Sequence, residues 1–214
     1  MTLPVDTLLV ILILSSFLVL GTTHLPTAIR LSAIQGISIG LLPLAIAPSD
    51  FSLRVILLGM VIIVLKGFVF PLLLRRAMRE SMTSTEMQPF VGSSASILVG
   101  LLALMAAFWL DSRMHFLPSR SHQLFPPVAF FVMMTGLFLI VARKLAVTQV
   151  VGYLQLENGI YVFGLSIAAE VPVVVELGVL LDVFVAVFVM GIAIFRINRE
   201  FNHMDSERLR HLKG

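Results

Sequence analysis

Three ionisable residues lie near the middle of long apolar stretches: Lys66, Glu157 and Asp182. A charged side chain at the centre of a bilayer costs about 2.5–3.5 kcal/mol on insertion scales, so three cost on the order of 8–10 kcal/mol. Charged residues in such positions usually face one another or a water-filled path, and many serve ion or proton transfer. We therefore treat these three as the candidate chemical groups.

The spacing of the three residues predicts that they lie at one depth. Each is nine to fourteen residues from the charged residues or proline that bound its segment, and helices rise about 1.5 Å per residue. Side chains at one depth on packed helices can meet. Lys66 could then pair with one acid as a structural contact, which leaves one carboxylate over. Alternatively, the carboxylates exchange protons, since burial and ion pairing shift the protonation of such groups in opposite directions.

Further polar residues surround these positions in the sequence. Tyr153 and Tyr161 lie four residues before and after Glu157, on the same helical face, and Asn158 adds a hydrogen-bonding amide. Glu176 lies about one turn into the last apolar segment, where it is an entry or exit group or a solvated helix-end acid. It is six residues from Asp182, so the two do not share a face.

Composition identifies an integral membrane protein. Hydrophobic residues make up 58% of the 214 residues and charged residues only 13%, whereas soluble domains are about half apolar and a quarter charged. The apolar runs are continuous, which favours helices over a barrel. We predict an all-α fold of about seven transmembrane helices: Val5–Leu20, Ala28–Ala47, Leu53–Leu74, Ser94–Leu110, Phe125–Ala142, Val150–Ala169 and Val173–Phe195.

Several local features qualify this division. The first segment is expected to be a retained helix rather than a cleaved signal, because the stretch from Met1 to Thr7 carries Asp6 and no Lys or Arg. Gly36 and Gly40 form a GxxxG pattern, which is a common helix-packing face. Pro71 either bends the third helix near Lys66 or marks the end of that helix. The stretch from Arg75 to Gly92 is polar and is expected to be a cytoplasmic mobile loop or an interfacial turn.

The distribution of basic residues predicts the orientation. If the N-terminus lies outside, eleven Lys and Arg residues fall on the cytoplasmic side and three on the outer side, with Lys66 inside the membrane. This N-out, C-in arrangement requires an odd number of spans. The basic residues flank apolar segments, so they do not indicate nucleic-acid binding.

The sequence contains no signature of a catalytic or cofactor site. Cysteine is absent, which excludes disulfides and thiolate-ligated metal centres in this chain. The five histidines fall in loops or the tail, and there is no P-loop or dinucleotide fingerprint. We expect this chain to bind no metal or cofactor.

The last three segments resemble the small three-helix K subunit of complex I. The pattern is Arg143-Lys144, then Gln155-Leu156-Glu157-Asn158, then Asp182 and Arg196. The chain departs from that pattern at Asp182, where the K subunit has a glutamate. The resemblance divides the chain into a four-helix extension (1–120), a K-like unit (121–197) and a cytoplasmic tail (198–214).

The whole length resembles the hydrogenase-4 component E family, which belongs to membrane-bound nickel–iron hydrogenases and formate hydrogenlyase-type complexes. The stretches that carry this resemblance are Lys66 with Pro71, Gly152-Tyr153 leading to Glu157-Asn158-Gly159, and Val175-Glu176-Leu177-Gly178 leading to Asp182. It implies a subunit of the bacterial or archaeal inner membrane, with no catalytic site of its own. Implied partners are antiporter-like membrane subunits, a quinone-site-like membrane anchor and a peripheral arm that holds the nickel–iron centre and Fe–S clusters.

The sequence thus predicts a membrane subunit of a complex I-like hydrogenase. In it, Glu157 and Asp182 carry protons, and the charge of Lys66 sets the balance between these two carriers. The alternatives are a standalone transporter of small solutes or ions and a pure scaffold subunit. A transporter would be expected to show an internal repeat or interrupted helices, and we find no convincing repeat.

Overall fold

The computed structural model of the chain describes residues 3–46, 53–80, 90–113 and 124–167, together with 176, 178, 180–184 and 187. These residues are almost entirely helical. The elements are α1 (Leu3–Gly21), α2 (Leu25–Ile46), α3 (Leu53–Val64), the π-helical turn η1 (Leu65–Val69), α4 (Phe70–Glu80), α5 (Ser93–Arg113), α6 (Phe125–Ala142) and α7 (Ala146–Ile167). The short helical pieces between 176 and 187, including the one that carries Asp182, fall within the predicted last segment.

The predicted segments agree with these helices to within a few residues, and α6 has the expected bounds. The helix α2 begins three residues earlier than expected, because Pro26 lies in its first turn, where proline is tolerated. The expected loop from Arg75 is wrong in its first part. Residues 75–80 continue α4, and the long side chains of Arg75 and Arg79 extend outward from that helix as exposed groups.

The third membrane segment is continuous but irregular. Its π turn is closed by the Phe70 N–H, which donates to the Leu65 carbonyl five residues back instead of four. Pro71 follows directly and has no N–H to donate, so the regular α-helical ladder is interrupted on both sides of Phe70. Lys66 lies inside this turn.

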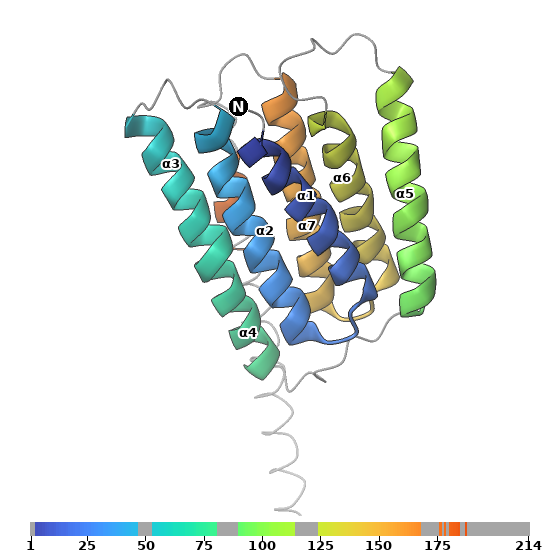
Figure 1. The fold of residues 1–214 in the computed structure, drawn as a ribbon. Helices are drawn as coiled ribbons and strands as arrows, with labels where there is room; N and C mark the ends of the chain where they lie inside the picture. The colour runs from blue at the N-terminus through green and yellow to red at the C-terminus, as the bar shows by residue number, and fades with distance from the viewer. Residues whose placement is uncertain are drawn as a thin grey trace, which may run out of the picture.

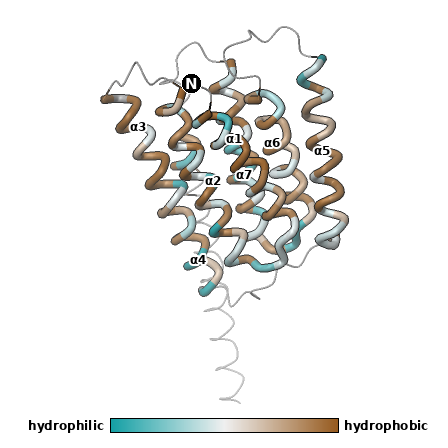
Figure 2. The backbone as a smooth tube through the Cα atoms, viewed as in Figure 1, coloured by the Kyte–Doolittle hydropathy of each residue, from teal (hydrophilic) through white to brown (hydrophobic). Residues whose placement is uncertain are grey.

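The helices stand side by side in a bundle, with α3 and α4 at one edge and α5 at the other (Figure 1). In the interior, α2 packs against α1, α7 and the third segment, and α6 packs against α7, α1 and α5. Apolar residues extend along the length of the helices, while hydrophilic residues gather at the end of α4 (Figure 2).

Five of the described helical segments are long and apolar enough to cross a membrane: α1, α2, the third segment from Val55 to Arg79, α5 and α6. Helix α7 is 22 residues long but carries Gln149, Gln155, Glu157 and Asn158, which lower its apolarity. A count of seven spans therefore stays a prediction.

Glycines set the closest approaches in the bundle. A Cβ at Gly136 would overlap the backbone of α7 at Leu156, and one at Gly159 would come within 2.6 Å of the Met133 backbone nitrogen. These contacts bring α6 and α7 into backbone contact, as small residues do in membrane helices.

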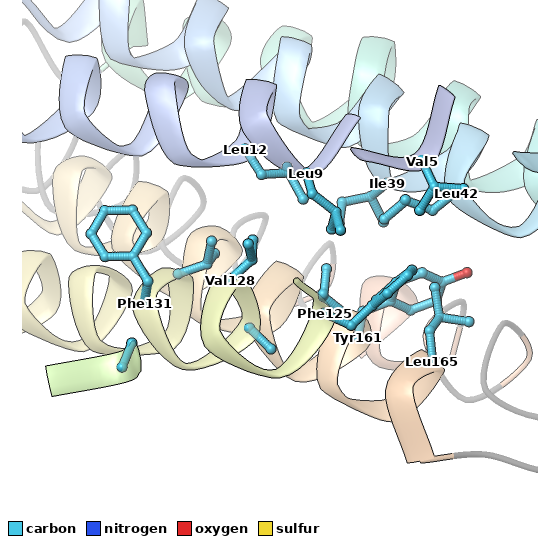
Figure 3. Packing of buried hydrophobic residues seen from close by; sticks show 14 of the residues in the cluster. Val5, Leu9, Leu12, Ile39, Leu42, Phe125, Val128, Phe131, Tyr161 and Leu165 are labelled. Carbon is cyan, nitrogen blue, oxygen red and sulfur yellow. The ribbon is translucent and has the colours of Figure 1, made fainter. Parts of the chain in front are cut away.

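Large apolar side chains fill the remaining interior. Leu9 and Leu12 of α1 pack toward Phe131 and Val128 of α6, and Tyr161 of α7 lies in the same cluster (Figure 3).

Candidate functional site

The structure brings Lys66, Glu157 and Asp182 together inside the bundle. The Lys66 ammonium Nζ lies 3.0 Å from Glu157 Oε1 and 3.1 Å from Asp182 Oδ1. The side chains are 4%, 2% and 0% exposed, respectively. The prediction that Lys66 approaches an acid is confirmed, and it approaches both.

The two carboxylates lie close to one another as well. Because each contacts the same ammonium at about 3 Å, the two oxygens are at most about 6 Å apart, a gap that one water can bridge. The three groups come from three separate segments: the π turn, α7 and the last described helical piece. We call Lys66, Glu157 and Asp182 the buried trio.

The π turn and a glycine seat Lys66 at this position. A Cβ at Gly36 of α2 would overlap the Lys66 Cβ and come within 2.7 Å of the Lys66 carbonyl carbon. The backbone of α2 therefore lies directly against the π turn. Gly40, one turn further, makes the same kind of approach to Ile63 and Gly59. The GxxxG pattern thus packs α2 against the residue that carries the buried charge.

A chain of hydrogen bonds leads from Lys66 to α1. Lys66 Nζ donates to Asn158 Oδ1 at 3.0 Å, and Asn158 Nδ2 donates to Gln35 Oε1 at 3.4 Å. Gln35 Nε2 donates to Ser16 Oγ at 3.2 Å, and the Ser16 hydroxyl donates to the Leu12 carbonyl at 2.7 Å. We call Asn158, Gln35 and Ser16 the amide arm.

Every hydrogen bond in the amide arm has the same direction. The Ser16 proton is used on a backbone carbonyl, so Ser16 accepts from Gln35. Gln35 in turn accepts from Asn158, which leaves Asn158 Oδ1 to accept from Lys66. The amides and hydroxyl of the arm do not ionise in the physiological range, so the arm orients Lys66 and does not itself take up or release a proton.

Some buried oxygens at the site have no hydrogen-bond partner among the described residues. They include Glu157 Oε2, Asp182 Oδ2 and the Tyr161 hydroxyl. The Tyr161 ring packs on Gly178, one helical turn before Asp182. Tyr161 therefore lies beside Asp182, although we predicted it only as a neighbour of Glu157.

The other predicted residues take different positions. Tyr153 is half-buried, one helical turn before Glu157. Glu176 is half-buried on a different face of its helix from Asp182. Gln155, two residues before Glu157, donates to Thr135 of α6 at 2.6 Å. Within the described part of the chain, no group of three or more His, Cys, Asp or Glu residues is placed to hold a metal.

Sequence analysis missed Gln35 and Ser16. Gln35 is fully buried near the middle of α2, directly before Gly36 of the GxxxG pattern. The feature that could have identified Gln35 from the sequence is a glutamine in the middle of a span next to a packing glycine.

A known protein is similar to this chain over nearly its whole length. The chain is 34% identical over 203 residues to a Mycobacterium tuberculosis protein called Uncharacterized protein Rv0085, covering 94% of this chain and 92% of that protein. The chain belongs to the family of this mycobacterial protein. This family therefore shares nearly the whole length of the chain, from the N-terminal helices to the segment that carries Asp182.

A second likeness is more distant. The chain is 26% identical over 151 residues to hydrogenase-4 component E of Escherichia coli, covering 70% of this chain and 69% of that protein. The component E of Shigella flexneri shows the same values. No family model and no solved structure matches the chain.

Proposed function

We propose that this chain is a membrane subunit of a hydrogenase-like complex and that its buried trio exchanges one proton between two carboxylates. The distant likeness to hydrogenase-4 component E supports membership of such a complex. The single observation that supports the proton role is the position of Lys66 between Glu157 and Asp182, at 3.0 and 3.1 Å.

The charge balance of the trio is the physical basis of this proposal. One ammonium and two ionised carboxylates carry a net charge of −1 at a depth where unbalanced charge is costly. The electrically neutral state has Lys66 charged, one carboxylate ionised and the other protonated. That state needs one extra proton, which can reside on Glu157 or on Asp182.

Each carboxylate has an oxygen suited to receive this proton. Glu157 Oε1 and Asp182 Oδ1 face Lys66, while Glu157 Oε2 and Asp182 Oδ2 have no hydrogen-bond partner among the described residues. A proton entering at one acid favours ionisation of the other, because Lys66 can balance only one negative charge. The amide arm holds the ammonium in place while this happens.

The finer features of the proposal follow the resemblance described above. The chain would have seven spans with the N-terminus outside, and its last three helices would form the unit like the K subunit of complex I. Antiporter-like subunits and a quinone-site-like anchor would adjoin it in the membrane. The nickel–iron centre and Fe–S clusters would belong to a peripheral arm.

The test is proton uptake by sealed vesicles that contain the complex, normalised to hydrogen turnover. Glu157→Gln and Asp182→Asn keep the shape and hydrogen bonding of each side chain but cannot carry a proton. We expect both to lower the ratio severalfold while hydrogen turnover in the peripheral arm continues, with Asp182→Glu the mildest change. Asp111→Asn is the matched control, because Asp111 lies at the end of α5, away from the trio.

Two results would overturn the proposal. If both neutral variants translocate protons at the unmodified ratio, the trio is a structural ion cluster and the chain is a scaffold. If the chain purifies from mild detergent as a single stable component, without nickel or Fe–S absorbance, membership of a hydrogenase-like complex is wrong.

A further inference from the structure

A cavity of about 570 Å³ lies beside α4, at the end of the third membrane segment. Its described lining has two parts: the apolar residues Val69, Leu72 and Leu73, and then three arginines, Arg75, Arg76 and Arg79. This volume falls within the range of about 300–1,000 Å³ that is typical of ligand pockets. The cavity is separate from the buried trio, and the proposed proton exchange does not use it.

The order of the lining residues along the helix matches an amphipathic ligand. The apolar residues belong to the membrane-spanning part, and the candidate span ends at Arg79. The three arginines are exposed and follow within seven residues of Leu72, at the level where a span leaves the hydrocarbon. A soluble anion would use the arginines but would leave the apolar wall uncovered.

We propose that this cavity binds one anionic phospholipid. The phosphate would lie against Arg75 and Arg79, which are one helical turn apart, and an acyl chain would cover Val69, Leu72 and Leu73. Guanidinium groups bind phosphate oxygens through paired N–H donors. Basic pockets beside the ends of membrane helices are typical sites for anionic headgroups.

The lipid would also contact the segment that holds the buried trio. Val69 is the last residue of the π turn and lies three residues after Lys66. An acyl chain against Val69 would therefore pack on the outer side of this turn. The lipid site is independent of the proposed proton exchange, because it rests on the arginines and the apolar wall alone.

The test is lipid binding by the full chain, purified in mild detergent with its associated subunits. Phosphatidylglycerol or phosphatidylcholine is added to the delipidated preparation, and bound lipid per chain is measured by mass spectrometry. One arginine near an anionic lipid is worth about 1 kcal/mol, or about fivefold in affinity. Arg75→Gln with Arg79→Gln should therefore weaken phosphatidylglycerol binding by roughly 25-fold.

Arg30→Gln is the matched control. Arg30 is an exposed arginine near the beginning of α2, at the same end of the bundle as α4, and it does not line the cavity. We expect this variant to bind phosphatidylglycerol as the unmodified chain does. Leu73→Trp, which fills the apolar part without changing charge, should also reduce binding, so the two halves of the site are tested separately.

Three outcomes would overturn the proposal. The first is phosphatidylglycerol binding by the double variant within twofold of that by the Arg30→Gln control. The second is equal binding of phosphatidylcholine and phosphatidylglycerol by the unmodified chain. The third is loss of an associated subunit from the double variant with unchanged lipid content, which would assign this face to a protein partner.

Discussion

Replacing Lys66 by methionine tests whether the buried trio depends on a shared cation. Methionine retains most of the volume of the side chain but removes the ammonium, which lies 3.0–3.1 Å from Glu157 Oε1, Asn158 Oδ1 and Asp182 Oδ1. Removing one partner of a buried ion pair typically costs about 3–5 kcal/mol, because the other charge stays buried and uncompensated. We expect a loss of this size in the free energy of unfolding.

The loss can be measured as a change in melting temperature. For a chain of this size, 1 kcal/mol corresponds to roughly 2–4 °C in Tm, so Lys66→Met should lower Tm by about 6–20 °C. The purified complex is heated in mild detergent, and the folded fraction of this chain is followed by brief proteolysis. Lys144→Met is the control, because Lys144 is exposed and its contact with the Phe90 ring at 4.8 Å is worth only about 0.5–1 kcal/mol.

Double variants then show which acid the lysine compensates. In a Glu157→Gln or Asp182→Asn background, Lys66→Met should cost less, with a coupling energy of about 0.5–3 kcal/mol for each pair. A Lys66→Met chain that unfolds within 1 kcal/mol of the unmodified chain, or costs that simply add in both backgrounds, would refute the shared ion pair. Complete loss of the assembled complex would instead identify the pair as structural.

Three further changes test the surroundings of the trio. Gly36→Ala adds a Cβ that overlaps Lys66, so it should lower the free energy of unfolding by about 1–3 kcal/mol, measured by thermal unfolding. Gly92→Ala is the control and should be nearly neutral, because a Cβ at Gly92 meets nothing within 4 Å. Gln35→Leu leaves the Asn158 amide without its acceptor and should cost about 1–3 kcal/mol, measured in the same way; a neutral result would refute the amide arm. Tyr161→Phe removes a buried hydroxyl that has no hydrogen-bond partner among the described residues, so Tm should not fall; a clear fall in Tm would show that the hydroxyl has a partner.

The sequence predicted the trio because charges are conspicuous in apolar segments and their depth follows from the helical rise. The meeting of Lys66 with both acids needed only the assumption that the three segments pack together. Gln35 and Ser16 were missed because neutral polar residues cost less in a membrane and therefore stand out less. Gln155 contacts α6 and not the trio, because residues two apart on a helix point in nearly opposite directions.

Some helix ends could be predicted from the sequence and others could not. The bounds of α6 were predicted because Pro126-Pro127 marks its beginning and the pair Arg143-Lys144 follows its end. The extension of α4 past Leu74 was missed because three arginines suggested a loop, although arginine is a good helix former. No residue type is characteristic of a π turn, and Pro71 was the only residue that indicated an irregular helix at this position.

The π turn has a consequence for how this family can change in length. Its hydrogen-bonded ring contains one residue more than that of an α-helix, so the turn holds a single surplus residue in the third segment. Deleting one residue elsewhere in α3 would rotate everything beyond it by about 100° and move Lys66 off the face that meets Glu157. Deleting one residue just after Lys66 would instead restore a regular helix and keep the facing of α3 and α4. A difference of one residue in length between relatives is therefore best accommodated at this turn. An alignment that placed this gap elsewhere in the segment would no longer match the position of Lys66.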